Sequence, residues 1–341
     1  MSQLSEWTKS WLMFALTLCS VFLVYGYQWA GGNPLTDLEI AWSSFQFAST
    51  LMLILLAHEL GHYFVAKHHG FQLSVPYFLP FPFAFGTLGA VIRLRSLPKS
   101  RTALLEMGAA GPIAGFVVAL VAFAIGMTQT INYAQPILPY ELLEIATPEP
   151  STVDIWFSHL GLYPLPEAGK TPLMLMADPL LLKMIGGLAL GEPLSPYAHL
   201  GPIAFAGWVG CLLTAINLIP VGQLDGGHIL NALSPSTADK RSRMLLCCAL
   251  LMTFIWTGWL FWVLMIWFIG AWRSLPVPED SDLSRRSWGV SFATVIVFAL
   301  CFMPRPMYIL QVDNQLIEWT SKTNSQNTQN ESINDSIQGK K

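Results

Sequence analysis

Two histidines and a glutamate with the spacing of a zinc-binding helix stand in the segment His58-Glu59-Leu60-Gly61-His62. On an α-helix, residues i and i+4 share one face, so His58 and His62 can hold one zinc ion between their imidazoles. Glu59 then lies within reach of a water molecule on that ion, which is the position of a general base. Residues 51–57, directly before the motif, carry no charge. The segment therefore predicts metal chemistry at the end of an apolar helix.

A third metal ligand is expected elsewhere in the chain, because hydrolytic zinc sites usually take three protein ligands. Asp225 is the strongest candidate, since it follows a later apolar stretch at a predicted membrane depth close to that of His62. Pro220 and the neighbouring glycines let the backbone leave helical geometry there and turn Asp225 toward the metal. His228 is the nearest rival, either as a ligand or as a residue that supports the ligands.

The composition is that of a membrane protein that crosses the bilayer several times. Of 341 residues, 53% are hydrophobic and only 11% are charged, against about 25% charged in an ordinary soluble domain. The net charge of -3 and the absence of a basic cluster exclude nucleic acid as a partner. The expected partner is instead the lipid bilayer.

Apolar stretches long enough to span the membrane predict an all-α polytopic fold with about six transmembrane helices. The stretch at 244–272 fits either one tilted helix or a tight pair of short helices, which leaves the side of the C-terminus open. The tail from about residue 312 is polar and poor in aromatic residues, so we expect it to be disordered. The six stretches are approximately residues 11–30, 42–66, 108–128, 201–220, 244–272 and 287–304.

Basic residues predict the orientation of these spans, because cytoplasmic loops carry an excess of lysine and arginine. The connection after the second span and the connection after the fourth span are both basic. They should face the cytoplasm, which places His58 and His62 toward the cytoplasmic half of the bilayer. The basic residues are Lys67, Arg93, Arg95, Lys99 and Arg101 in the first connection and Lys240, Arg241 and Arg243 in the second.

A proline-rich segment and a strand-like segment follow the zinc motif. Residues 75–82 contain three prolines and cannot form a regular helix, whereas residues 88–95 have the composition of a strand. We expect a re-entrant segment with a β-hairpin. Its edge strand could pair with an unwound substrate chain.

The two motifs together resemble the site-2 protease family of intramembrane zinc metalloproteases. H-E-x-x-H at 58–62 and N-x-x-P-x-x-x-L-D-G at 217–226 carry the resemblance, which extends through residues 85–92 and 108–115 and covers about 42–235. It implies that His58, His62 and Asp225 bind zinc and that Glu59 is the general base. It also implies that Asn217 positions the substrate or stabilises the oxyanion.

The resemblance divides the chain into four parts. Residues 1–41 are expected to form a first transmembrane helix and loop, and 42–235 the metalloprotease core. Residues 236–311 are expected to form the C-terminal transmembrane helices, and 312–341 the polar tail.

The predicted function is zinc-dependent endopeptidase cleavage within a transmembrane segment of a membrane-anchored protein, in regulated intramembrane proteolysis. The alternative is a cation transporter, in which the same His and Asp cluster is a transit site. A relative that has lost activity and serves as a scaffold is a third possibility. The substrate and the oligomeric state do not follow from the sequence.

Overall fold

The computed structural model describes residues 5–132, 170–177, 179–195, 198–268, 272–278 and 282–313. The chain divides into two compact units. The first contains residues 1–130, 178–194 and 200–304, and the second contains residues 131–177, 195–199 and 305–341. All the residues singled out above for chemistry belong to the first unit.

Three helices of the first unit are long and apolar enough to cross a membrane. Helix α1 (Glu6–Val24) continues into a π-helical turn (Tyr25–Trp29), and it is followed by α2 (Leu38–His68) and α3 (Arg101–Gly126). The last two begin earlier than the hydropathy predicts. The reason is N-capping: Asp37 accepts from the amides of Glu39 and Ile40, and Ser100 accepts from that of Ala103.

The other predicted spans form shorter helices, so the count of six is not reached by helix length alone. The stretch at 244–272 is not one helix, because a 3-10 turn (Met252–Phe254) separates α9 from α10. Helix α6 lies in the connection between the third and fourth predicted spans, where no helix was expected. These helices are α6 (Leu180–Leu190), α7 (Pro202–Asn217), α8 (Asp225–Leu233), α9 (Ala238–Leu251), α10 (Gly258–Phe268) and α11 (Arg285–Cys301).

The expected β-hairpin is present between α2 and α3. Strands β1 (Tyr77–Pro80) and β2 (Thr87–Val91) pair in antiparallel fashion. Side chains from α1 and from the π-helical turn after it hold the hairpin segment. Ser10 Oγ donates to the Pro76 carbonyl (2.6 Å), and Trp29 Nε1 donates to the Ala84 carbonyl (2.9 Å). The hairpin is therefore anchored on α1 as well as through its own strand pairing.

The second unit contains an antiparallel pair formed by β3 (Lys170–Met176) and β4 (Met307–Asp313). The polar tail predicted from residue 312 lies outside the described residues, apart from the last residues of β4. The described fold is mostly helical, with two small antiparallel β-pairs.

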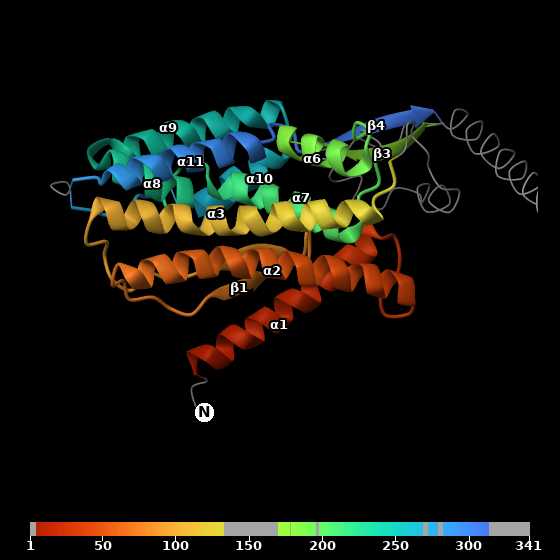
Figure 1. Cartoon of the computed structure of the whole chain (residues 1–341), viewed down its shortest axis with the longest axis horizontal. Coiled ribbons are helices and arrows are strands. Elements are labelled where there is room, and N and C mark those ends of the chain that lie inside the picture. Colours follow the sequence, from red (N-terminus) through yellow and green to blue (C-terminus); the bar gives the residue numbers. More distant parts are fainter. Residues whose placement is uncertain are drawn as a thin grey trace, which may run out of the picture. The chain divides into compact units, whose positions relative to one another are not determined.

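Helix α3 is the central helix of the first unit. It packs against α2, α7, α8 and α11, and Figure 1 shows α2 and α3 side by side. Glycines allow the closest approaches between these helices. A Cβ at Gly207 of α7 would lie 2.7 Å from the Ala119 carbonyl oxygen and 2.9 Å from the Phe123 Cα, both on α3. The core of the unit therefore depends on backbone contacts between helices that larger residues would prevent.

We predict that Gly207→Ala lowers the free energy of unfolding by about 1–3 kcal/mol, the usual cost of overpacking a closely packed contact. Gly289→Ala on α11 is the matched control, because among the described residues no atom beyond its chain neighbours and its own helix backbone lies within 4 Å of a Cβ at that position. The control should be neutral or raise stability by up to about 1 kcal/mol through helix propensity. Unfolding of both variants in detergent checks this, and equal stability would contradict the close packing of α3 and α7.

Candidate metal centre

The side chains of His58, His62 and Asp225 converge on one point. His58 Nε2 lies 3.2 Å from Asp225 Oδ2, and His62 Nε2 lies 3.2 Å from Asp225 Oδ1. The two Nε2 atoms are 3.1 Å apart. The three ligand atoms lie within 4.8 Å of one another, as in a site that could hold one metal ion. The two histidines, which share one face of α2, thus lie next to a carboxylate that is more than 160 residues further along the chain.

The backbone of α3 orients the His62 ring. His62 Nδ1 lies 2.8 Å from the Met107 carbonyl oxygen, which can only accept a hydrogen bond. Nδ1 therefore carries the proton, and Nε2 presents its lone pair to the cluster. This carbonyl contact has the form that holds ligating histidines in other metal proteins.

Glycines on one face of α3 make room for the imidazoles. A Cβ at Gly111 would collide with the His62 ring, and a Cβ at Gly115 would lie 3.1 Å from the His58 Cβ. One turn earlier, a Cβ at Gly108 would lie 3.0 Å from the Cβ of His228. In the sequence these small residues stand out only as part of the stretch 108–115 that carries the family resemblance. In the structure they form a smooth face against which the rings of His58 and His62 and the Cβ of His228 lie.

Asp225 reaches the histidines because the chain folds tightly between α7 and α8. Gly222 has a positive φ of 52°, and its amide donates to Ser242 Oγ on α9 (2.9 Å). Side chains at Gly226 and Gly227 would collide with the backbone of this turn. Asp225 is the first residue of α8, so its position follows directly from the turn. Ser242 is a supporting residue that no sequence pattern near the motif indicated.

Glu59 and Asn217 line the same cavity as the cluster. The cavity has a volume of about 180 Å³ and also borders Val91 and Ile92 at the hairpin. Glu59 is 4% exposed, and Asn217 is the last residue of α7. All five predicted site residues are thus brought together, next to a strand that could receive an extended chain.

His228 lines this cavity too, but it is not part of the group of metal-ligating atoms. Burial lowers the pKa of its imidazole to about 4, although the Asp225 carboxylate acts in the opposite direction. The imidazole is therefore neutral at neutral pH. Its Nδ1 is buried without a hydrogen-bond partner among the described residues.

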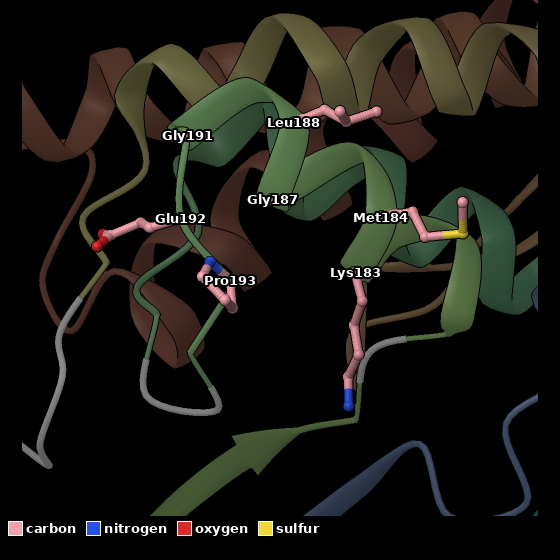
Figure 2. A pocket seen from close by; sticks show the side chains of 7 residues that line it. All are labelled: Lys183, Met184, Gly187, Leu188, Gly191, Glu192 and Pro193. Carbon is pink, nitrogen blue, oxygen red and sulfur yellow. The ribbon is translucent and has the colours of Figure 1, made fainter.

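A second hollow, of about 430 Å³, lies on α6 and the turn after it. Figure 2 shows that the Lys183, Leu188 and Glu192 side chains leave the chain in different directions rather than converging. None of the predicted site residues lines it. The larger hollow is therefore not the candidate site.

Known proteins resemble this chain over most of its length. Residues 46–257 match the model of Peptidase family M50. "Probable zinc metalloprotease EGY2, chloroplastic" from Arabidopsis thaliana is 29% identical over 273 residues, which are 79% of this chain and 43% of that protein. "Probable zinc metalloprotease EGY1, chloroplastic" from the same plant is 31% identical over 177 residues, 51% of this chain and 27% of that protein. The chain spans less than half the length of these curated relatives.

The site-2 protease from Methanocaldococcus jannaschii is a solved structure with 18% identity and a TM-score of 0.38, over 80% of this chain and 93% of that one. Family membership rests instead on the match of residues 46–257, which is well over half of the 341 residues. The chain belongs to Peptidase family M50.

Proposed function

We propose that the chain is a zinc-dependent intramembrane endopeptidase that cleaves a transmembrane segment of a membrane-anchored protein. The observation that carries this proposal is the convergence of His58, His62 and Asp225 in one cavity with the buried Glu59. Membership of a peptidase family and the three candidate membrane helices support it.

The donor set fits zinc. Two imidazole nitrogens and one carboxylate oxygen are ligands that zinc accepts in catalytic sites, with a fourth position left for water or substrate. Zinc–ligand bonds of 2.0–2.2 Å in a tetrahedron would place ligand atoms about 3.3–3.6 Å apart. The distances of 3.1–3.2 Å between the three side chains are close to the lower end of this range.

Each residue of the site has a role in peptide hydrolysis. When bound, zinc supplies Lewis-acid polarisation of the scissile carbonyl and makes water acidic enough to react at neutral pH. Glu59 takes the proton from the attacking water and later delivers it to the leaving amine. Asn217, at the end of α7, offers an amide donor to the substrate carbonyl. The low exposure of Glu59 keeps bulk water from competing for that proton.

A transmembrane substrate must unwind before cleavage, because helical hydrogen bonds occupy its carbonyls. We propose that the unwound segment pairs with the free edge of the chain at Ala90 to Ile92, which borders the cavity. The amide of Arg93 donates to Ser74 Oγ (2.9 Å), and that of Arg95 donates to the Gln72 carbonyl (2.8 Å). Amide directions alternate in an extended chain, so the Ile92 amide faces away from these partners.

The proposal extends to the membrane topology. Helices α7, α9 with α10, and α11 complete about six spans, and the hairpin is re-entrant. The metal centre lies toward the cytoplasm, since Lys67 is in the last turn of α2 and Arg93 and Arg95 follow that helix. Residues 42–235 form the catalytic core, flanked by the helix and loop at 1–41, the helices at 236–311 and the tail at 312–341. Release of a membrane-anchored regulator is the proposed outcome.

A cation transporter is the weaker alternative. A transit site needs ligands that release the ion on both sides of the membrane, whereas here the His62 ring is held by the Met107 carbonyl and seated against Gly111. An ion transit site does not require the buried carboxylate of Glu59 between the two histidines, whereas peptide hydrolysis requires it as a general base.

We predict that Glu59→Gln lowers the rate of cleavage by about 10²–10⁴-fold, the usual contribution of a general base. Zinc content should stay at the native level, because Glu59 is not one of the ligands. Comparison of membrane proteomes from cells with the native chain and with this variant would reveal the accumulated substrate. Undiminished proteolysis by Glu59→Gln would refute the assignment of the base.

Gly111→Ala should weaken zinc binding by at least about tenfold, since the added methyl group collides with the His62 ring and displaces it from the Met107 carbonyl. Competition with a chromophoric chelator measures the zinc dissociation constant. Gly289→Ala, in open space on α11, is the control for the same chemical change. If both variants bind zinc as the native chain does, the cluster does not depend on this face of α3.

Ile92→Pro should lower kcat/KM for a transmembrane substrate by about five- to tenfold, the equivalent of one main-chain hydrogen bond. Ile92→Ala keeps the amide and is the matched control. Both are assayed on folded, zinc-loaded protein. Normal cleavage by Ile92→Pro would mean that the substrate does not pair with this edge.

A further inference from the structure

The side chains of three histidines contact α3 at successive points along its length. Gly108, Gly111 and Gly115 occupy positions i, i+3 and i+7 and face His228, His62 and His58 in that order. Three residues of α-helix rise by about 4.5 Å. The His228 side chain therefore contacts α3 about one helical turn from the point where the ligand His62 does. This rise is little more than the length of one residue of extended chain, about 3.3–3.6 Å.

The Nδ1 atom of His228 is the unusual feature of these three side chains. The residue is 8% exposed, and Nδ1 is buried without a hydrogen-bond partner among the described residues. Leaving such a group unsatisfied is unfavourable, because it gives up its hydrogen bonds to water and gains none in return. An imidazole that served only to fill space would ordinarily find a backbone partner, as His62 Nδ1 does with the Met107 carbonyl. A partner absent from the free protein resolves the discrepancy.

The place of His228 indicates which molecule supplies that partner. The residue lines the same cavity as Glu59 and Asn217, and this cavity also borders Val91 and Ile92 at the hairpin. A substrate chain in this cavity brings unwound backbone carbonyls that have lost their helical donors. A neutral imidazole carries one N–H donor and can satisfy one of them.

We propose that His228 is a further catalytic residue, whose Nδ1–H donates a hydrogen bond to the carbonyl oxygen of the scissile peptide bond. This inference rests on the proposed peptidase function. No proton is transferred in this step. The hydrogen bond strengthens as negative charge develops on the oxygen, so that its main effect is on the transition state. Asn217 and His228 then hold the reacting carbonyl from two different helices, α7 and α8.

The test uses three substitutions of His228 in the full-length, zinc-loaded protein. His228→Asn places an amide nitrogen near the position of Nδ1, His228→Gln places one nearer to Nε2, and His228→Leu removes both. The probe is a synthetic peptide of about 25 residues, which is long enough to span a bilayer. It consists of a helix of leucine and alanine that is interrupted at its centre by Asn-Gly-Pro. A fluorophore and a quencher at its two ends report cleavage. Zinc stoichiometry is measured for every variant.

The expected result is a loss of about 10²–10³-fold in kcat for His228→Leu and His228→Gln, the usual effect of removing one oxyanion donor. KM and zinc content should stay near native values, and His228→Asn should recover most of the rate. Equal rates in all three variants, or a rise in KM alone, would overturn the proposal. Loss of zinc in His228→Leu and His228→Asn alike would also overturn it, because His228 would then belong to the ligand set.

A control on the same helix separates catalysis from packing. Asn231 is 2% exposed and donates through Nδ2 to the Leu275 carbonyl (2.6 Å), one turn further along α8. Asn231→Leu should lower thermal stability and leave kcat per bound zinc within about twofold. If it reduces kcat as strongly as His228→Leu does, the effect of His228 is structural and the proposal fails.

A binding experiment distinguishes failure of this inference from failure of the proposed function. The same segment with a phosphonamidate at the break mimics the tetrahedral transition state and needs no turnover. His228→Leu should weaken its binding by about 10²-fold, whereas Glu59→Gln should leave the probe bound. Unchanged binding to His228→Leu would contradict the role of His228. If the native zinc-loaded protein neither bound nor cleaved either probe, the proposed peptidase function would be refuted, and the inference about His228 would fail with it.

Discussion

The contact between α2 and one glycine-lined face of α3 is the constraint on which the site depends. His58 and His62 lie on α2 with the spacing of one helical turn, but their rings need space inside a tightly packed bundle. Gly111 and Gly115 provide it, and the Met107 carbonyl fixes the ring of His62. Because α3 also packs against α7 and α8, this single helix sets the distances among the elements that carry the histidines, Asn217 and Asp225.

The site buries charged groups, and this burial costs free energy unless other groups compensate it. A carboxylate placed in an apolar bundle is costly unless cations or donors compensate it. Asp225 lies 3.2 Å from each histidine, and zinc between the three groups would balance the negative charge. The turn before α8, held by Ser242 and permitted by Gly222, Gly226 and Gly227, stabilises a position that an isolated aspartate would not adopt. The geometry of the candidate site is thus supported from α3 and from α9.

Much of the fold followed from local patterns. The long apolar stretches predicted α1, α2 and α3, and prolines at 76, 80 and 82 with a strand-like segment predicted the hairpin. The predicted ends of the helices were less accurate, because hydropathy does not detect N-caps. The caps at Asp37 and Ser100 start α2 and α3 within polar sequence. Helix α6 and the break between α9 and α10 were not decided by composition. Both depend on how an apolar segment packs against its neighbours.

The sequence by itself determined the pair of histidines and the position of Glu59 beside them, since a covalent spacing of four residues becomes a shared face as soon as the helix forms. It also indicated Asp225, but it left His228 as a rival. Only the tertiary structure decided which of them meets the histidines, because one turn of α8 separates the two and the orientation of that helix comes from contacts with α3 and α9. The same packing assigned the glycines of α3 to the imidazoles, a role that depends on side chains from two other helices and has no signature within α3.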